Sequence, residues 1–149
     1  MNKEEFLDIT REFMRNQGFQ LLRKSKFYFK ADEFVLKIEL QHSECDELYY
    51  FNFNVRINEL HSQVTRIDDT VEWDLILGRL INSKDYAFIV KYLEVEKEEY
   101  LNLLQKKYVQ QIEPILDEGL KKLIWLEENN ISYIDFKKGI LEYLQEKYK

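Results

Sequence analysis

Residues that interrupt, loosen or crosslink a fold are scarce in this chain. Its 149 residues include one proline, four glycines and one cysteine. With so little proline and glycine, no segment resembles a flexible linker or a low-complexity tail, so we expect a single domain over residues 1–149. The lone Cys45 excludes an internal disulfide. The glycines are isolated from one another, which excludes a phosphate-binding glycine loop.

Long hydrophobic runs are also missing. The longest, residues 75–81 and 86–93, are interrupted by Arg79 and Lys91 and are far shorter than the roughly 20 residues of a membrane-spanning helix. The first residues lack the basic and then apolar pattern of a signal peptide. We therefore expect no membrane partner and a cytoplasmic location.

Positive charge is in deficit, with 22 Lys and Arg against 28 Asp and Glu and a net charge of −6. An acidic protein repels phosphate backbones and attracts cationic surfaces. The balance disfavours nucleic acid and favours a protein partner, with a basic surface as the expected chemistry. Solubility alone would explain the acidity equally well.

Aromatic residues are abundant, at 15% of the chain, and their spacing predicts the first half of the fold. Apolar residues at helical spacing, followed by Gly18 and Phe19, predict an N-terminal helix that ends near Gln17. Four alternating segments, residues 19–22, 27–30, 34–41 and 48–58, predict strands. Their short polar connections predict an antiparallel meander.

The second half is predicted to be mainly helical. Apolar residues Trp73, Ile76, Leu77, Leu80 and Ile81 fit one helical stripe, and residues 86–92 fit a short strand or a buried helical turn. Residues 95–130 fit helix interrupted near Pro114, and Asp135 is predicted to cap a last helix. The predicted fold is α+β, with an N-terminal helix, an antiparallel meander of about four or five strands, and C-terminal helices covering one sheet face.

The sequence offers little for catalysis, and we predict no catalytic, cofactor-binding or metal-ligating residue. Cys45 lies close to His42, but the neighbouring carboxylates oppose formation of a thiolate. An acidic group (His61, Asp68, Asp69, Glu72 and Asp74) matches no known ligand spacing, although a divergent metal-dependent hydrolase or nuclease using Asp68–Asp74 stays open as an alternative.

A single-stranded nucleic-acid binder is the other alternative. Lys24, Lys26 and Lys30 interleave with the aromatic residues 27–29, which are the ingredients of a stacking platform. Lysines at sheet edges also prevent unwanted strand pairing, which explains the same pattern without any ligand.

Two acidic runs with adjacent tyrosines are the best candidates for a partner-binding surface. They consist of Glu44, Asp46, Glu47, Tyr49 and Tyr50, and of Glu94, Glu96, Glu98 and Glu99. The second run is also suited to the start of a helix, where negative charge complements the helix dipole.

A combination of weak motifs resembles an uncharacterised bacterial family of unknown function. The motifs are Gly18-Phe19, a basic turn with Lys24, the strand Phe27-Tyr28-Phe29, a strand ending in Gln41, a strand with Asn52, Trp73-x4-Gly78-Arg79-Leu80, and a helix with Pro114. The resemblance spans about residues 3–128 and implies an α+β fold without an established activity. Tyr86-Ala87-Phe88 stands where the family often has paired tryptophans. Because genes of such small proteins have secreted toxins among their neighbours, the resemblance implies an immunity protein as one role.

Overall fold

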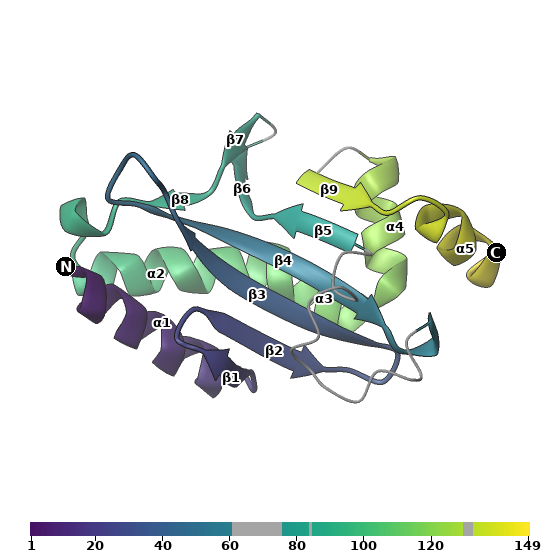
Figure 1. Cartoon of the computed structure of the whole chain (residues 1–149), viewed down its shortest axis with the longest axis horizontal. Coiled ribbons are helices and arrows are strands. Elements are labelled where there is room, and N and C mark those ends of the chain that lie inside the picture. The colour runs from purple at the N-terminus through teal and green to yellow at the C-terminus, as the bar shows by residue number, and fades with distance from the viewer. Residues whose placement is uncertain (61–75, 84, 130–132) are drawn as a thin grey trace.

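The computed structural model places an antiparallel sheet against a layer of helices (Figure 1). It describes residues 1–60, 76–83, 85–129 and 133–149. Within these residues the main sheet has seven strands. Six of them lie in the order β1 (Gln20–Arg23), β2 (Lys26–Lys30), β3 (Phe34–His42), β4 (Tyr49–Ile57), β5 (Ile76–Arg79) and β9 (Tyr133–Phe136). The seventh, β8 (Ile89–Val90), pairs with β4 outside this path. The α+β prediction is confirmed, and the sheet is larger than the four or five strands expected.

The first helix, α1 (Lys3–Asn16), has strong signals at both ends. Asn2 and Glu5 form a reciprocal capping box, in which the Asn2 side chain accepts from the Glu5 amide at 2.8 Å. At the other end, Gly18 has φ +92°, and the Phe19 amide donates to the Met14 carbonyl at 3.0 Å. This is a Schellman cap, and it confirms the stop predicted from Gly18 and Phe19.

The predicted meander is confirmed, and no strand end differs from its predicted position by more than one residue. Its strands are β1 (Gln20–Arg23), β2 (Lys26–Lys30), β3 (Phe34–His42) and β4 (Tyr49–Ile57), each antiparallel to the next. Along β4, Phe51, Phe53 and Val55 are buried, whereas Asn52 and Asn54 are half-buried on the opposite face. One sheet face is therefore apolar and the other polar.

The predicted helical stripe around Leu77 is wrong for its described residues, and Trp73 lies outside them. Residues 76–83 form β5 (Ile76–Arg79) and β6 (Ile81–Ser83), and β5 pairs with β4. Gly78 lies opposite Phe53, and a Cβ atom at Gly78 would lie 2.0 Å from the Phe53 ring. Residues 76–79 are therefore extended, although their apolar spacing also fits a helix, because pairing with the edge of β4 outweighs the local periodicity.

The expected strand within residues 86–92 is present as two short strands. β7 (Tyr86–Ala87) pairs with β6 in a separate two-stranded sheet, and β8 (Ile89–Val90) pairs with the start of β4. The β6–β7 hairpin projects from the upper part of the molecule in Figure 1.

Helical structure then fills most of the predicted range 95–130. The 3-10 turn η3 (Tyr92–Glu94) precedes α2 (Lys97–Lys107), the π-helical turn η4 (Tyr108–Ile112), α3 (Glu113–Glu118) and α4 (Leu120–Glu128). Proline has no backbone N–H to donate, and its ring crowds the preceding helical turn. Both effects explain the widened turn shortly before Pro114. The helix is interrupted between α3 and α4 at Gly119, where φ is +73°.

The predicted cap at Asp135 is wrong. Asp135 lies within β9 (Tyr133–Phe136), which pairs with β5, and the last helix α5 (Ile140–Lys147) begins after Gly139 at φ +86°. The exposed edge of β5 explains the difference, since its unpaired backbone groups take β9 as a partner.

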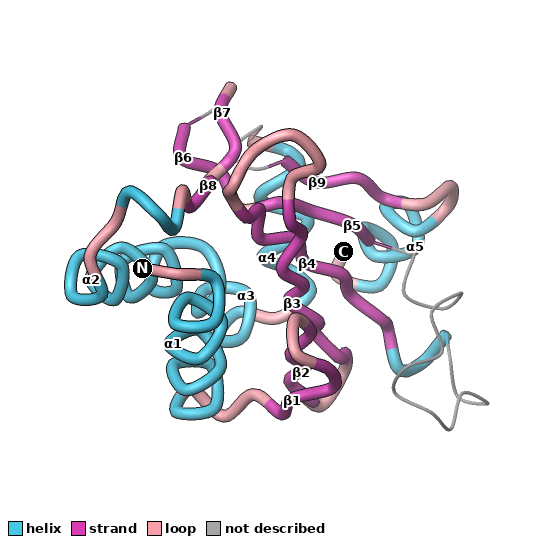
Figure 2. The backbone as a smooth tube through the Cα atoms, turned by 60° about the vertical axis from the view of Figure 1, so that its left-hand side comes forward, coloured by secondary structure: helices cyan, strands magenta, loops and turns pink. Residues whose placement is uncertain are grey.

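Helices cover the apolar face of the sheet, as predicted. Figure 2 shows α1, α2 and α3 on one side of the strands, and α5 packs against α4. Phe6 of α1 stacks on Tyr49 at 4.7 Å between ring centroids and lies 4.9 Å from the Tyr100 ring of α2. In the described part of the chain, no helix combines the length and hydrophobicity that crossing a membrane requires.

Candidate functional site

The β3–β4 loop presents the first predicted acidic run to solvent. Glu44, Asp46 and Glu47 are all exposed. The hydroxyl oxygen of Ser43 accepts hydrogen bonds from the amides of Cys45 at 3.2 Å and Asp46 at 3.3 Å. By satisfying backbone donors inside the turn, Ser43 fixes the conformation of this loop.

The second acidic run leads from η3 into α2. Glu94, Glu96, Glu98 and Glu99 are exposed, and α2 begins directly after Glu96. This confirms that the run lies at the start of a helix, where negative charge complements the dipole. The segment is held in place by the N-terminal ammonium of Met1, which donates to the carbonyls of Tyr92 at 2.9 Å and Val95 at 3.0 Å.

Tyr92 joins the two acidic runs. It is 2% exposed, and its hydroxyl donates a hydrogen bond to the Glu47 carboxylate. His42 is adjacent, with its Nε2 atom 3.3 Å from the Tyr92 hydroxyl and 3.7 Å from the Glu47 carboxylate. The structure thus brings together two runs separated by about 45 residues of sequence. Both lie at the end of the molecule that carries the N-terminus (Figure 1).

The same contact perturbs both ionisable groups. The hydrogen bond from Tyr92 and the nearby His42 lower the pKa of Glu47. Donation to Glu47, together with burial, raises the pKa of Tyr92 to about 12. Both shifts favour an ionised Glu47 beside a neutral tyrosine, so the link persists across neutral pH.

The two predicted tyrosine anchors are placed differently from the expectation. Tyr49 is 4% exposed and packs beneath Phe6, so it belongs to the core, because its position on β4 faces the helices. Tyr50 is half-buried on the opposite face, with the guanidinium of Arg79 4.3 Å from its ring centroid.

Three exposed apolar side chains belong to residues 86–93, the segment that precedes the second acidic run. Tyr86 is 72% exposed, Ile89 39% and Leu93 61%. Leu93 directly precedes Glu94, and Ile89 lies opposite Tyr50 across the β8–β4 pair. Sequence reasoning did not identify Leu93. The available signal was an apolar residue directly before the charged run that begins at Glu94.

We call this surface the acidic edge. It comprises the exposed side chains Glu44, Asp46, Glu47, Leu93, Glu94, Glu96, Glu98 and Glu99. The lysine within it, Lys97, is paired with Glu5 at 2.9 Å, and this hydrogen bond lowers the pKa of Glu5. Leu93 is exposed between Glu94 and Tyr92, the residue that contacts Glu47, so an apolar side chain and carboxylates occur together, as in the apolar centre and polar rim of protein interfaces.

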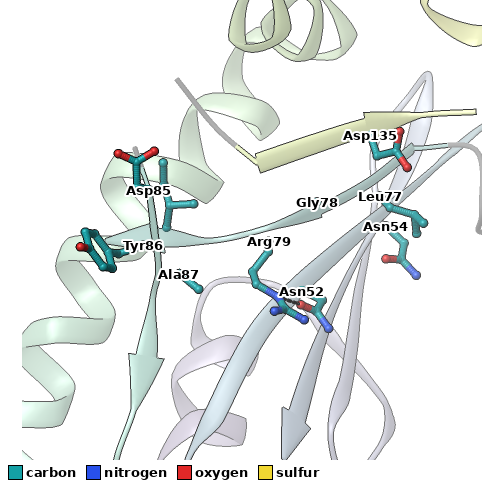
Figure 3. Close-up of a pocket in the computed structure, with 10 residues that line it drawn as sticks. Asn52, Asn54, Leu77, Gly78, Arg79, Asp85, Tyr86, Ala87 and Asp135 are labelled. Carbon is teal, nitrogen blue, oxygen red and sulfur yellow. Dashed lines mark hydrogen bonds between the residues drawn. The ribbon is translucent and has the colours of Figure 1, made fainter. Parts of the chain in front are cut away.

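A separate hollow of about 690 Å³ opens on the polar face of the sheet (Figure 3). Asn52 and Asn54 of β4 and Arg79 of β5 line it from the main sheet, and Asp85 and Tyr86 line it from the β7 side. Asp135 of β9 lies at its other border. Figure 3 shows Arg79 and Asn52 side by side in its wall.

Arg79 is held in this hollow by neutral partners. Its Nε atom donates to Asn52 at 2.8 Å, and an Nη atom donates to Gln41 at 2.9 Å. The amide of Asn52 donates to the same Gln41 oxygen at 2.7 Å. The network orders the polar face without neutralising the guanidinium. Alternation of polar residues in strands 34–41 and 48–58 was the signal for this face, and Arg79 itself was not predicted as a site residue.

The groups that would carry the alternative functions are placed as follows. The acidic group His61, Asp68, Asp69, Glu72 and Asp74 lies outside the described residues. Within the described ranges, no cluster of His, Cys, Asp and Glu side chains is arranged to hold a metal ion. Cys45 is a free, exposed thiol in the β3–β4 loop.

The basic and aromatic pattern around β2 is divided between surface and core. Lys24 and Lys30 are exposed, and Lys26 lies 3.8 Å from the Glu39 carboxylate. Phe27 is buried, and Phe29 packs against Phe19 with 5.4 Å between ring centroids. These two rings therefore contribute to the core instead of a stacking platform.

The fold and the site define an α+β protein with a helix-covered antiparallel sheet and an acidic edge around one exposed leucine. Residues 10–118 match the family described as "Domain of unknown function (DUF4304)", and the chain belongs to this family. The resemblance to an uncharacterised family is thereby confirmed. No curated protein and no solved structure matches the chain.

Proposed function

We propose that the chain is a single-domain, non-catalytic protein-binding module whose acidic edge docks a basic protein. The observation that carries the proposal is the exposure of Leu93, 61% accessible, among carboxylates of two segments joined through Tyr92. A leucine in this setting supplies apolar contact area, and the surrounding carboxylates supply charge complementarity.

A well-supported surface favours binding because little ordering is needed when the partner arrives. The Met1 ammonium, the buried Tyr92 ring and the capped first turn of α1 all hold this end of the molecule. The carboxylates also accelerate encounter with a cationic partner. The expected complex is therefore sensitive to salt, whereas its lifetime depends on the contact at Leu93.

Among protein-binding roles, we propose immunity against a toxin. A toxin that attacks nucleic acid needs a positively charged binding surface, and an acidic protein seated on that surface blocks access to the substrate. The resemblance to small bacterial proteins with toxin genes nearby supports the same role.

The first test is to isolate the protein from its native host with crosslinking and to identify the partner by mass spectrometry. Affinity is then measured by calorimetry at low and high salt for wild type, Leu93→Ala and Leu60→Ala. Leu60 is a matched control because it is 41% exposed and follows the opposite end of β4, roughly 26 Å from the acidic edge.

We expect a basic partner whose affinity falls with salt and falls about fivefold or more in Leu93→Ala, since truncating an interface anchor costs more than about 1 kcal/mol. Leu60→Ala should bind like wild type. A protein recovered alone, or equal binding by both variants, would refute the docking proposal. For the immunity role, the partner expressed alone should arrest growth, and co-expression of the wild type but not of Leu93→Ala should restore it.

A further inference from the structure

A second hollow, of about 640 Å³, lies between β6 and the helices α2 to α4. It contains no residue of the acidic edge, and of its described lining residues it shares Ile81 with the hollow in Figure 3. Its apolar lining consists of the half-buried Ile81, Pro114 and Leu126 over the buried Phe53, Leu80 and Ile115. Pockets of this volume, with an apolar lining and a few polar groups, are the usual form of small-ligand sites.

Lys107, the last residue of α2, is the unusual member of the lining. It is 6% exposed, and its Nζ atom donates to the Ile81 carbonyl at 3.0 Å. The ammonium also lies 5.3 Å from the centroid of the Phe88 ring. Among the described residues it has no carboxylate partner, and burial lowers its pKa. A buried ammonium with one carbonyl acceptor retains donors and charge for an anion.

The π-helical turn η4 fixes this geometry. The side chain of Gln111 in this turn makes two hydrogen bonds to the backbone of Ile81. Its Oε1 atom accepts from the Ile81 amide at 2.9 Å, and its Nε2 atom donates to the Ile81 carbonyl at 2.5 Å. The Ile81 carbonyl is therefore satisfied without Lys107. A carbonyl oxygen has two lone pairs, so it accepts from both Gln111 and Lys107, and the bond to this neutral acceptor leaves the charge of the Lys107 ammonium in place. Widened helical turns of this kind occur frequently at functional sites.

The electrostatics of the lining contrast with the net charge of the chain. The chain has 28 acidic residues, yet none of the described residues that line this hollow is acidic. The lining contains a second cation, Lys122, which is 3.4 Å from Glu118 and packs on Trp125. The uncharged polar groups are Asn82, Ser83, Gln110, Gln111 and Asn129. The local field therefore favours an anion.

We propose that this hollow binds a small organic anion, with its apolar body on Ile81, Pro114 and Leu126 and its anionic group at Lys107. The shared chemistry is one carboxylate, phosphate or sulfonate attached to a ring or short hydrocarbon. Lysine suits this role because its ammonium is a compact charge that does not demand a planar partner.

The test compares two fluorescent probes that differ by one charged group. The anionic probe is 1-anilinonaphthalene-8-sulfonate, and the neutral probe is N-phenyl-1-naphthylamine, which has the same rings without the sulfonate. Both are titrated into wild type, Lys107→Met and Lys106→Met. The methionine keeps the apolar stem of Lys107 in place, and Lys106 is an exposed neighbour that gives an identical change in net charge.

We expect saturable binding of the anionic probe to wild type and to Lys106→Met, and binding weaker by about tenfold or more in Lys107→Met, since a hydrogen bond to a charged group is worth that ratio. The neutral probe should bind all three proteins equally. The proposal is overturned by equal affinity of the anionic probe for both variants, or by the absence of saturable binding to wild type.

A measurement on wild type alone covers the case in which Lys107→Met does not fold. In a nitrogen–proton NMR spectrum, the side-chain amides of Gln110 and Gln111 should shift on addition of the anionic probe. The side-chain amide of Asn2, at the other end of α2 near Val95, should not. Shifts confined to residues outside the hollow would contradict the proposed location.

Discussion

Replacing Gly78 with alanine is the sharpest test of how the sheet is packed. A Cβ atom at this position would lie 2.0 Å from Cζ and 2.4 Å from Cε1 of Phe53 on the neighbouring strand. Carbon atoms in contact are normally about 3.5–4.0 Å apart, so the ring must move by roughly 1.5–2 Å. Phe53 is 2% exposed, so the ring can move only against its core neighbours or toward the hollow that it lines.

The size of the effect follows from two opposing terms. Overpacking a close-packed interior costs about 1–3 kcal/mol, and the large overlap here places Gly78→Ala at the upper end of that range. Alanine recovers about 0.5–1 kcal/mol relative to glycine within a strand. We therefore expect a net loss of about 2 kcal/mol in the free energy of unfolding, or a fall in Tm of roughly 4–8 °C for a chain of this length.

The assay is urea unfolding of wild type, Gly78→Ala, Phe53→Leu and the double variant. Phe53→Leu removes ring volume, so the two changes should compensate by about 1 kcal/mol or more in the double-mutant cycle. Gly139→Ala is a control for backbone strain, because its φ is +86° and nothing lies within 4 Å of the added methyl. Unaltered stability of Gly78→Ala, or additive effects in the cycle, would refute this description of the packing.

Two further predictions concern buried and linking hydrogen bonds. Thr10→Val removes the hydroxyl that lies 2.6 Å from the buried Tyr100 hydroxyl, and it should lower the free energy of unfolding in urea by about 1–3 kcal/mol. Adding Tyr100→Phe should recover part of this loss. A larger loss in the double variant would contradict the reasoning. Tyr92→Phe should raise the pKa of Glu47 toward its ordinary value, measured by carbon NMR, because the Tyr92 hydroxyl is the main cause of its depression. A carboxyl group whose pKa is lower in the folded state stabilises the fold at pH values above its pKa in the unfolded state. This stabilisation is lost as the pH falls through its pKa in the folded state. The stability difference between Tyr92→Phe and wild type should therefore shrink in acid. An unmoved Glu47 titration would show that the link is absent.

Local signals were sufficient for the N-terminal half of the fold. The stop at Gly18 and Phe19 was readable because a left-handed glycine followed by a buried aromatic residue is a local device. The four meander strands were readable because alternation and short connections together define antiparallel neighbours. The acidic runs at residues 44–47 and 94–99 were likewise visible as exposed carboxylates.

The errors fall where a strand edge determines the outcome. Ile76, Leu77, Leu80 and Ile81 fit a helical stripe, yet β5 pairs with β4 and leaves Leu77 exposed. Gly78 was the neglected signal, because an isolated glycine within a strand marks a close approach by a neighbour. Asp135 resembles a helix cap because no local signal points to its strand partner Leu77, which lies 58 residues earlier in the chain.

The sequence by itself determined the α+β class, the first helix, the meander, and the excess of negative charge, because each depends on composition or on contacts a few residues apart. Only the tertiary structure decided that Tyr49 is buried while Leu93 is exposed, that Tyr92 joins the two acidic runs, and that Lys107 lines a hollow without a carboxylate among the described residues. Those outcomes depend on which distant segments share an edge or a face, and that is settled by packing across the whole chain instead of by local preference.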